Sequence, residues 1–218
     1  MFNCVTTVSN KLLKFYNRYS ISKNMMKNST EIIAHCYFQD ILLKSPDTAG
    51  HCQRVMHISC QIGNALNLSQ ENMEKLQLAS LLHDFGKVYI PDKVLNKIGS
   101  LKKNEYEIIK THCMKGYQEL SKNQKLLEIA EIILYHHERY NGSGYPTGKK
   151  GTCIPILSRI ITAADAYDAM TSVRNYKLQL STEEAIAELN NGRSAQFDSQ
   201  IVDVLIRLIG NEGISCLQ

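Results

Sequence analysis

The chain has 218 residues, 44% of them hydrophobic, and carries a formal net charge of +4 at pH 7. This length is enough for one substantial core, and the composition is that of a globular protein, so wholesale disorder is excluded. No apolar run approaches the roughly 20 residues that a membrane-spanning helix requires. The seven cysteines contain no Cys-x-x-Cys pair and favour a reduced compartment over a disulfide framework, so we expect a cytoplasmic protein.

The basic charge is concentrated near the N-terminus. Residues 1–30 contain five basic residues and no acidic residue, whereas the remainder holds 20 basic and 21 acidic residues. Most of the chain therefore lacks the positive surface of a protein that binds duplex nucleic acid. We expect residues 1–29 to form a basic extension without a secretory signal, and residues 30–218 to form the functional domain. Apolar residues in the extension leave open a contact with a membrane surface or a partner, although a frayed terminus is the simpler interpretation.

Helical patterns follow one another from residue 30 onward. Apolar residues recur at helical spacing, and Ser69, Ser181 with Glu184, and Asp198 are suited to cap the helices that follow them. Strand signals are nearly absent, so we predict an all-α domain. The predicted helices span residues 30–44, 69–84, 126–139, 154–172, 182–190 and 199–209.

A glycine-rich loop interrupts the helices at residues 141–152, with the sequence NGSGYPTGKKGT. Gly142 and Gly144 allow a positive φ and a close approach of backbone to a ligand, which larger residues would forbid. Tyr145 and Pro146 would then form a rigid side of the binding surface, from which the phenol group of Tyr145 projects. Two adjacent histidines lie just before this loop, which suggests metal chemistry beside a substrate-binding surface.

Several histidines and aspartates along the helices are candidate metal ligands. Imidazole suits iron, manganese or zinc, and a carboxylate binds hard divalent ions and can bridge two of them. Adjacent residues on a helix diverge by roughly 100°, so a His-His or His-Asp pair can contact two neighbouring ions but cannot chelate one. This pattern predicts a cluster of two or three ions. The candidates are His51, the pair His83-Asp84, His112, the pair His136-His137, Asp165 in an otherwise apolar helix, and Asp47 four residues before His51.

Two cysteines directly follow candidate ligands. Cys52 comes after His51, and Cys113 comes after His112. Since neighbouring residues on a helix point in different directions, we expect both thiols to face away from the ions and to serve as small buried fillers.

The motifs HDFGKVYIPD, HHERYNGSGYP and AADAYDAMTSVRNYK, with GHCQRV before them and KTHCMKG between them, carry a family resemblance. Over residues 30–215 the chain resembles the HD-GYP family, a branch of the HD metal-dependent phosphohydrolases. The resemblance implies an all-α, HD-type helical bundle with a centre of two or three iron or manganese ions. It also implies hydrolysis of the bacterial second messenger cyclic di-GMP to pGpG and GMP, through metal-activated hydroxide that attacks the phosphodiester.

The resemblance further implies a role for each motif residue. Asp84 would bridge the ions, and Lys87 would stabilise charge on the scissile phosphate. The substrate would be bound by Gly144, Tyr145 and Pro146 of the loop and by Arg174 and Lys177. The metal ligands would be Asp47, His51, His83, Asp84, His112, His136, His137 and Asp165.

Departures from the family pattern leave alternatives open. Asp47 stands where trinuclear members carry a glutamate, Asn141 replaces a favoured aspartate, and Cys113 replaces a common proline. A non-catalytic module that binds a cyclic dinucleotide or a protein is therefore one alternative. An enzyme that acts on another cyclic dinucleotide, such as cyclic GMP-AMP, is a second, and a homodimer or a regulatory protein partner is also left open. Retention of His83, Asp84 and Asp165 favours an active enzyme, with a trinuclear centre slightly preferred.

Overall fold

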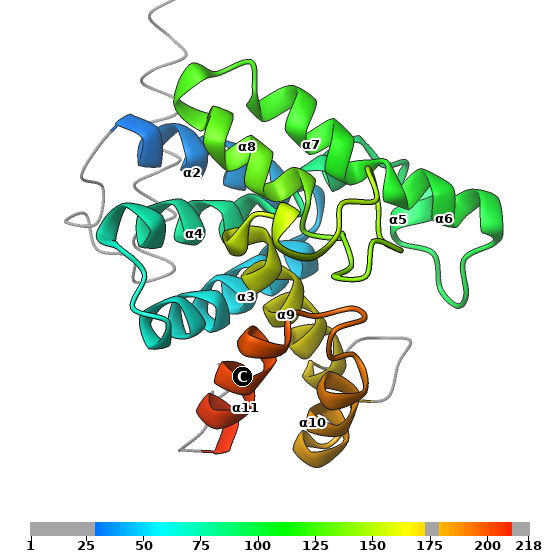
Figure 1. Ribbon diagram of the computed structural model, residues 1–218. Coiled ribbons are helices and arrows are strands. Elements are labelled where there is room, and N and C mark those ends of the chain that lie inside the picture. The colour runs from blue at the N-terminus through cyan, green and yellow to red at the C-terminus, as the bar shows by residue number, and fades with distance from the viewer. Residues whose placement is uncertain (1–28, 173–178, 211–218) are drawn as a thin grey trace, which may run out of the picture.

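The computed structural model describes residues 29–172 and 179–210 of the protein. These ranges contain no strand apart from an isolated bridge between Arg193 and Phe197, and the predicted all-α fold is confirmed. In the same ranges, no helix combines the length and the apolar character needed to cross a membrane. The helices, shown in Figure 1, are α2 (Ser29–Lys44), α3 (Pro46–Ala65), α4 (Gln70–Leu82), η2 (Phe85–Tyr89), α5 (Asp92–Leu95), α6 (Lys103–Lys110), α7 (His112–Leu120), η3 (Gln124–Leu126), α8 (Leu127–Leu134), η4 (Gly151–Cys153), α9 (Ile156–Thr171), α10 (Thr182–Asn191) and α11 (Ser199–Gly210).

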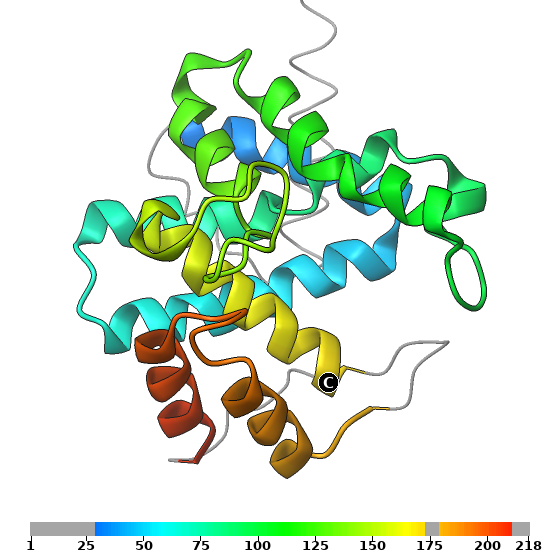
Figure 2. The same ribbon diagram turned by 45° about the vertical axis from the view of Figure 1, so that its right-hand side comes forward.

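Two long helices, α3 and α9, pack against each other at the centre of the fold. Helix α4 packs along α3, α8 packs on α4, and α7 pairs with α8, while α10 and α11 both contact α9. Figure 2 shows α9 crossing α3, with α7 and α8 above the crossing and α10 and α11 below it. The crossing therefore brings the middle of α9 close to α3 and to the end of α4.

The apolar core explains why α9 tolerates an almost continuous run of hydrophobic residues. Ile160, Ile161, Ala163 and Ala164 are all fully buried, so successive positions around this helix face other helices. Full burial of one large aliphatic side chain is worth about 1.5–3 kcal/mol. A carboxylate at Asp165, within this run, therefore needs partners that offset the loss of water.

The predicted helix caps are present. The Ser69 side chain accepts a hydrogen bond from Asn72 N, and Asp198 accepts one from Gln200 N. Ser181 and Glu184 form the reciprocal capping box that opens α10. These helix starts were predictable because a cap is a contact between residues only a few positions apart.

Two predicted helices end earlier than expected, and both ends lie at the candidate ligands. Helix α4 stops at Leu82 and α8 at Leu134, so His83, Asp84, His136 and His137 lie in turns beyond the helices. In neither case does a glycine or proline stand within the three residues after the last helical position, so both predicted helices extended into the candidate ligands.

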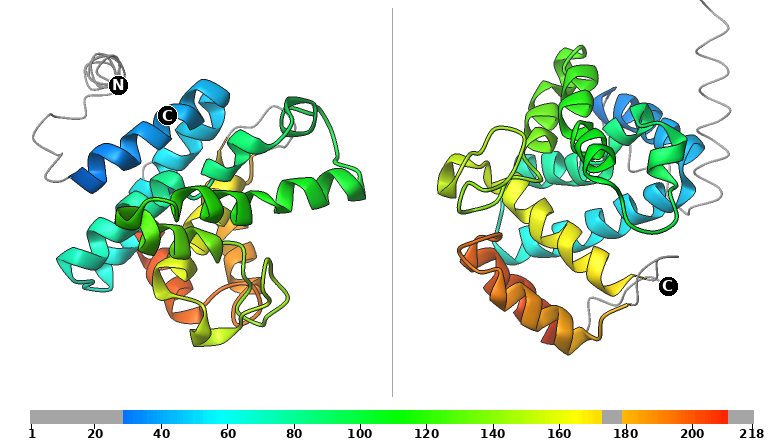
Figure 3. Two further views of the ribbon diagram at one scale, coloured as in Figure 1. Left: turned by 90° about the horizontal axis from the view of Figure 1, so that it is seen from above. Right: turned by 90° about the vertical axis from the view of Figure 1, so that its right-hand side faces the viewer.

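Four α-helices of the described residues, α3, α5, α6 and α7, were not among the predicted spans. Helix α3 begins at the Ser45 cap, whose side chain accepts from Thr48 N, and its many polar residues obscure its buried face. Helices α6 and α7 are short and meet at Thr111. Figure 3 shows α6 projecting from the main bundle, with α7 continuing from its end toward the centre.

Candidate metal centre

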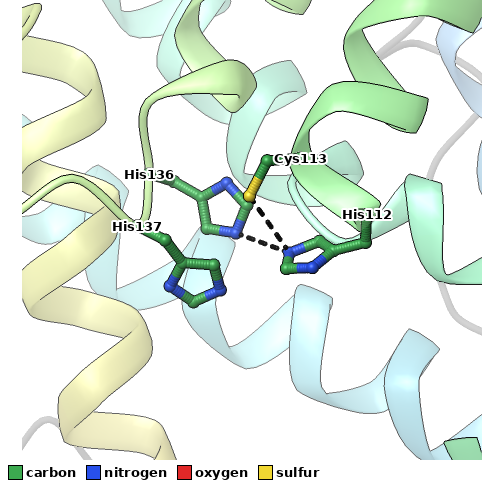
Figure 4. A group of neighbouring side chains, drawn as sticks. All are labelled: His112, Cys113, His136 and His137. Atoms are coloured by element: carbon green, nitrogen blue, oxygen red, sulfur yellow. Dashed lines mark hydrogen bonds between the residues drawn. The ribbon is translucent and has the colours of Figure 1, made fainter. Parts of the chain in front are cut away.

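The fold brings most of the predicted ligands to one buried place. Helix α3 supplies one histidine, and the turns after α4 and α8 supply a pair each. The start of α7 supplies a histidine, and the middle of α9 an aspartate. Two groups of side chains result, one of His51, His83 and Asp84 and the other of His112, Cys113, His136 and His137, each with its candidate ligand atoms within 4.8 Å of one another. Figure 4 shows the second group, in which His112 from α7 faces the two histidines from the turn after α8.

Asp84 connects the two groups. Its Oδ2 lies 3.8 Å from His51 Nε2 and 3.5 Å from His83 Nε2, and its Oδ1 lies 3.4 Å from His112 Nε2. The two oxygens of one carboxylate therefore face different imidazoles. This arrangement is the one that a carboxylate bridging two ions requires.

Glycine at position 86 makes this approach possible. A Cβ atom there would lie 1.9 Å from the carbonyl oxygen of His112, a separation that no side chain permits. Helix η2 can therefore lie directly against the start of α7, which brings Asp84 beside His112. The sequence contains a signal for this contact, because glycine inside a helical turn usually has a packing reason.

Three imidazoles are oriented by backbone carbonyl groups. The Nδ1 atoms of His83, His112 and His136 lie 2.7, 2.7 and 2.5 Å from the carbonyl oxygens three residues earlier. A carbonyl oxygen only accepts hydrogen bonds, so Nδ1 carries the proton and Nε2 of the neutral ring keeps its lone pair. All three Nε2 atoms therefore turn toward the centre in the form that binds a metal.

Burial keeps these rings neutral. It lowers the pKa of His112 to about 3 and of His137 to about 4, and it also lowers the pKa of His83 and His136. Burial alone would raise the pKa of Asp84, but the positive charge of Lys87, the largest opposing influence, holds it well below the usual range.

Asp165 is the carboxylate that α9 contributes. Burial alone would raise its pKa, but the hydrogen bond and charge of His51 help to keep that pKa low. Its Oδ1 lies 3.0 Å from His51 Nε2. Near neutral pH, ionised carboxylates thus face the neutral rings of His83, His112, His136 and His137, whereas hydrogen bonds to Asp165 and Asp168 raise the pKa of His51 against the effect of burial.

A divalent ion fits this set of atoms. His83 Nε2 and Asp84 Oδ1 are buried and have no hydrogen-bond partner among the described residues. His112 Nε2 lies 3.2 Å from His136 Nε2, although both atoms carry lone pairs. Ligand atoms that each lie about 2.1 Å from one ion are about 3 Å apart. The cluster could therefore bind metal, since a cation would satisfy atoms that residues 29–172 and 179–210 leave without a partner.

Cys113 differs from its predicted orientation. It is fully buried, as predicted, but its sulfur lies 3.5 Å from His112 Nε2 and belongs to the second group. The expectation that it faces away is therefore wrong. At the start of α7 the His112 ring folds back toward the carbonyl of Ile109 in α6, and its Nε2 lies beside the neighbouring thiol. Burial raises the pKa of that thiol, which keeps it protonated.

Asp47 and Lys87 occupy different positions relative to the cluster. Asp47 is exposed on the first turn of α3 and belongs to neither buried group. The Lys87 ammonium lies 2.6 Å from Asp84 Oδ2, and its side chain is 24% exposed. The two residues predicted to be catalytic thus contact each other, with Lys87 on the more exposed side of the buried Asp84 carboxylate.

The glycine-rich loop packs beside the histidines. The Tyr145 ring centroid lies 5.0 Å from that of His137, and Tyr145 N donates to the His137 carbonyl. Gly142 has the predicted positive φ, at 87°. At Gly144 the close approach is to the chain itself, because a Cβ there would lie 2.2 Å from Arg139 N.

Sequence reasoning missed a carboxylate that holds this loop. Glu138 is 1% exposed, and its Oε1 accepts hydrogen bonds from Thr147 N, Thr147 Oγ1 and Gly148 N. The sequence contained a signal for this role, because Glu138 directly follows the paired histidines and precedes the turn residues of the loop. Pro146 follows Tyr145 in the loop, whereas Arg174 and Lys177 lie outside the described residues.

A second missed carboxylate supports His51. Asp168 on α9 is 1% exposed and its Oδ2 lies 2.6 Å from His51 Nδ1, while Arg54 Nε donates to its other oxygen. Hydrogen bonds from His51 and Arg54 lower the Asp168 pKa to about 2, against the effect of burial. The motif AADAYDAM contains both aspartates, but only the first had been selected.

The chain is similar to several known proteins. A family model described as "HD domain" matches residues 37–201. The cyclic di-GMP phosphodiesterase response regulator RpfG of Xanthomonas campestris is 35% identical over 203 residues, which are 92% of this chain and 54% of that protein. A cyclic di-GMP phosphodiesterase of Thermotoga maritima is 40% identical over 164 residues, 74% of this chain and 45% of its own. The chain thus spans about half the length of these two curated relatives.

A solved structure extends the similarity to the fold. A cyclic GMP-AMP specific phosphodiesterase of V. cholerae is 27% identical, with a TM-score of 0.61, over 84% of this chain and 49% of that one. The family model covers most of the chain and includes every buried ligand candidate. The protein belongs to the HD domain family, and its HHERYNGSGYP motif is that of the HD-GYP branch.

Proposed function

We propose that the protein is a metal-dependent phosphodiesterase that hydrolyses cyclic di-GMP to pGpG, to GMP, or to both. One observation carries the proposal. Buried imidazoles and carboxylates converge, and in the part of the chain that the structure describes, His83 Nε2 and Asp84 Oδ1 have no hydrogen-bond partner. The names of two relatives, both cyclic di-GMP phosphodiesterases, support the choice of substrate.

The proposed cofactor is a group of two or three divalent ions, iron or manganese. Such ions would supply Lewis-acid activation of water and neutralise charge on the phosphodiester. Nitrogen and carboxylate ligands suit both metals. Asp47 is proposed for a third ion only, because it is exposed on the first turn of α3, whereas Asp165 contacts His51. The proposed ligands of the other ions are His51, His83, Asp84, His112, His136, His137 and Asp165.

Asp84 and Lys87 are the proposed catalytic residues. Asp84 would bridge the ions, since its two oxygens face different imidazoles. Lys87, partly exposed beside it, would place its ammonium group against the scissile phosphate and stabilise the negative charge that develops there.

The substrate would be bound by the loop and by the segment after α9. Gly144, Tyr145 and Pro146 would form one wall of the pocket, with the phenol of Tyr145 against the dinucleotide. Arg174 and Lys177 would bind its phosphate or guanine groups, and the planar guanidinium suits either. We also propose that residues 30–218 carry this activity in the cytoplasm.

A second cyclic dinucleotide is a candidate substrate. The V. cholerae protein described as cyclic GMP-AMP specific has the same fold and is 27% identical to this chain. Both substrates share a phosphodiester ring and a guanine, so the same ions and loop could act on either. A competition assay between cyclic di-GMP and 3'3'-cyclic GMP-AMP distinguishes the two.

The test uses protein purified without air and loaded with Mn(II) or Fe(II). We expect chromatography to detect pGpG or GMP from cyclic di-GMP, and no product after metal removal or in Asp84→Asn. Asp203→Asn, at an exposed ion pair with Arg193, is the matched control and should stay active. Tight binding of the dinucleotide without turnover, in fully loaded protein, would instead identify a non-catalytic binding module.

A further inference from the structure

Asp168 lies at the centre of a buried hydrogen-bond network behind His51. Its Oδ2 is 2.6 Å from His51 Nδ1 and 3.1 Å from Arg54 Nη2. Its Oδ1 accepts from Arg54 Nε at 2.6 Å and from Ser172 Oγ at 2.9 Å. The carboxylate is 1% exposed, so protein groups replace the water that it would otherwise bind.

His51 differs from three other imidazoles of the centre in the partner of its Nδ1 atom. The Nδ1 atoms of His83, His112 and His136 face backbone carbonyl groups three residues earlier. His51 lies inside α3, and its Nδ1 faces the Asp168 carboxylate of α9 at 2.6 Å. This ring is therefore oriented by a side chain from another helix.

We propose that Asp168, itself held by Arg54, is a positioning residue that fixes the ring orientation and tautomer of His51 for metal binding. The inference rests on the metal centre of the proposed function. By accepting the Nδ1 proton, Asp168 leaves the lone pair on Nε2, which faces Asp165 and Asp84. A carboxylate partner of this kind also increases the basicity of a ligating imidazole.

Arg54 has a defined part in this arrangement. Its guanidinium contacts both oxygens of Asp168 and also donates to Ser172 Oγ at 3.1 Å. The planar fork fixes the carboxylate in one rotation, which an ammonium group on a flexible chain would not do. Arg54→Lys keeps the positive charge but should allow the Asp168 carboxylate to rotate.

Asp168→Asn is the informative substitution. It keeps the shape of the side chain but replaces one acceptor oxygen with an NH2 group, although His51, Arg54 and Ser172 all donate toward this side chain. Either Arg54 loses an acceptor or His51 meets a donor at Nδ1, which moves the ring proton to Nε2. Loss of such a partner typically weakens metal binding by about 10- to 100-fold.

The matched control is Asp198→Asn. Asp198 is also buried, is paired with an arginine, Arg159, and caps α11, but it belongs to neither group of candidate ligands. The same chemical change there should lower the temperature of unfolding without changing the affinity for metal.

The experiment titrates metal-stripped protein with Mn(II) and follows free Mn(II) by its electron paramagnetic resonance signal. The titration gives the Mn(II) dissociation constant of each variant. We expect Asp168→Asn to raise the constant about 10- to 100-fold. Arg54→Lys should raise it less, and Asp198→Asn should leave it within about twofold of the wild type. His51→Ala provides the decisive background, because a residue that acts through His51 has no further effect once that ring is gone.

Three results would overturn the inference. The first is an unchanged Mn(II) affinity in Asp168→Asn, and the second is an equal loss of Mn(II) affinity in Asp198→Asn. The third is a loss of Mn(II) affinity from Asp168→Asn that is the same in the wild-type and His51→Ala backgrounds. If Asp168→Asn does not fold, Arg54→Lys takes its place in the same cycle. Wild-type protein that binds no Mn(II) would contradict the proposed function itself, and the two failures are thus distinguishable.

Discussion

At the scale of single residues, burial of neutral imidazoles makes the metal-free protein sensitive to acid. In an unfolded chain these rings titrate near pH 6.5, whereas in the fold the pKa of His137 is about 4 and that of His112 about 3. Below pH 6.5 the unfolded state therefore binds more protons than the folded state, and the free energy of unfolding falls as pH falls. His83 and His136 act in the same direction, while His51, with its raised pKa, acts in the other.

We therefore expect urea unfolding of the metal-free protein to show decreasing stability from pH 7 to pH 5. Each imidazole that stays neutral contributes roughly 2 kcal/mol to the loss at pH 5. Constant or increasing stability over this range would show that the rings are already protonated in the fold.

Cys113 allows a test of which atoms in the second group bind metal. Its sulfur is within reach of His112 Nε2, but burial favours the neutral thiol, and manganese prefers nitrogen and oxygen ligands. Cys113→Ala should leave the Mn(II) content of the protein unchanged and cost about 1 kcal/mol of stability through the small cavity. Elemental analysis and thermal unfolding provide the two readouts. A lower metal content would make this cysteine a ligand.

At the scale of elements, the contact between η2 and α7 depends on the absence of a side chain at residue 86. Gly86→Ala should separate these helices, because its Cβ would meet the His112 carbonyl at 1.9 Å. We expect a loss of about 1–3 kcal/mol in stability, as for other overpacked positions, together with weaker Mn(II) binding as Asp84 moves from His112. Gly210→Ala is the control, since open space surrounds that position. Equal Mn(II) affinity in both variants would contradict this role.

The glycine-rich loop depends on Glu138 in a similar way. Glu138→Ala removes the acceptor for Thr147 and Gly148, so the loop that carries Tyr145 loses its anchor. We expect the KM for the dinucleotide to rise about tenfold, as one good charge-assisted anchor is worth roughly 1.5–3 kcal/mol, with metal content unchanged. Glu138→Gln keeps an acceptor oxygen and should behave nearly as the wild type. Simultaneous loss of metal would instead mean that the loop supports the centre itself.

Features that depend on residues close together in the sequence could be predicted, whereas a contact between distant residues could not. Caps at Ser69 and Ser181 were predictable because they involve residues a few positions apart. The candidate ligands were identified through motifs, and most of them lie close together, as a metal centre requires. Asp168 was missed because its contact with His51 joins residues 117 positions apart. The early ends of α4 and α8 were missed because the imidazoles themselves bind the last carbonyl groups there.

At the scale of the whole molecule, the centre joins helices that are far apart in the sequence. Bound ions would therefore stabilise the entire fold, by about 2.7 kcal/mol when the free ion is at 100 times its dissociation constant. We expect a chelator to lower the temperature of unfolding of Mn(II)-loaded protein by several degrees. Asp84→Asn should show little change with the same chelator. An identical temperature with and without chelator in the wild type would argue against an ion in this position.

The spread of these ligands also bears on biosynthesis. His51 is made early, whereas Asp165 and its neighbour Asp168 lie on α9, well over a hundred residues later. A nascent polypeptide that has not yet released α9 from the ribosome has an incomplete set of donors. Metallation would therefore follow translation of most of this domain, and truncated products that end before α9 should accumulate as apoprotein.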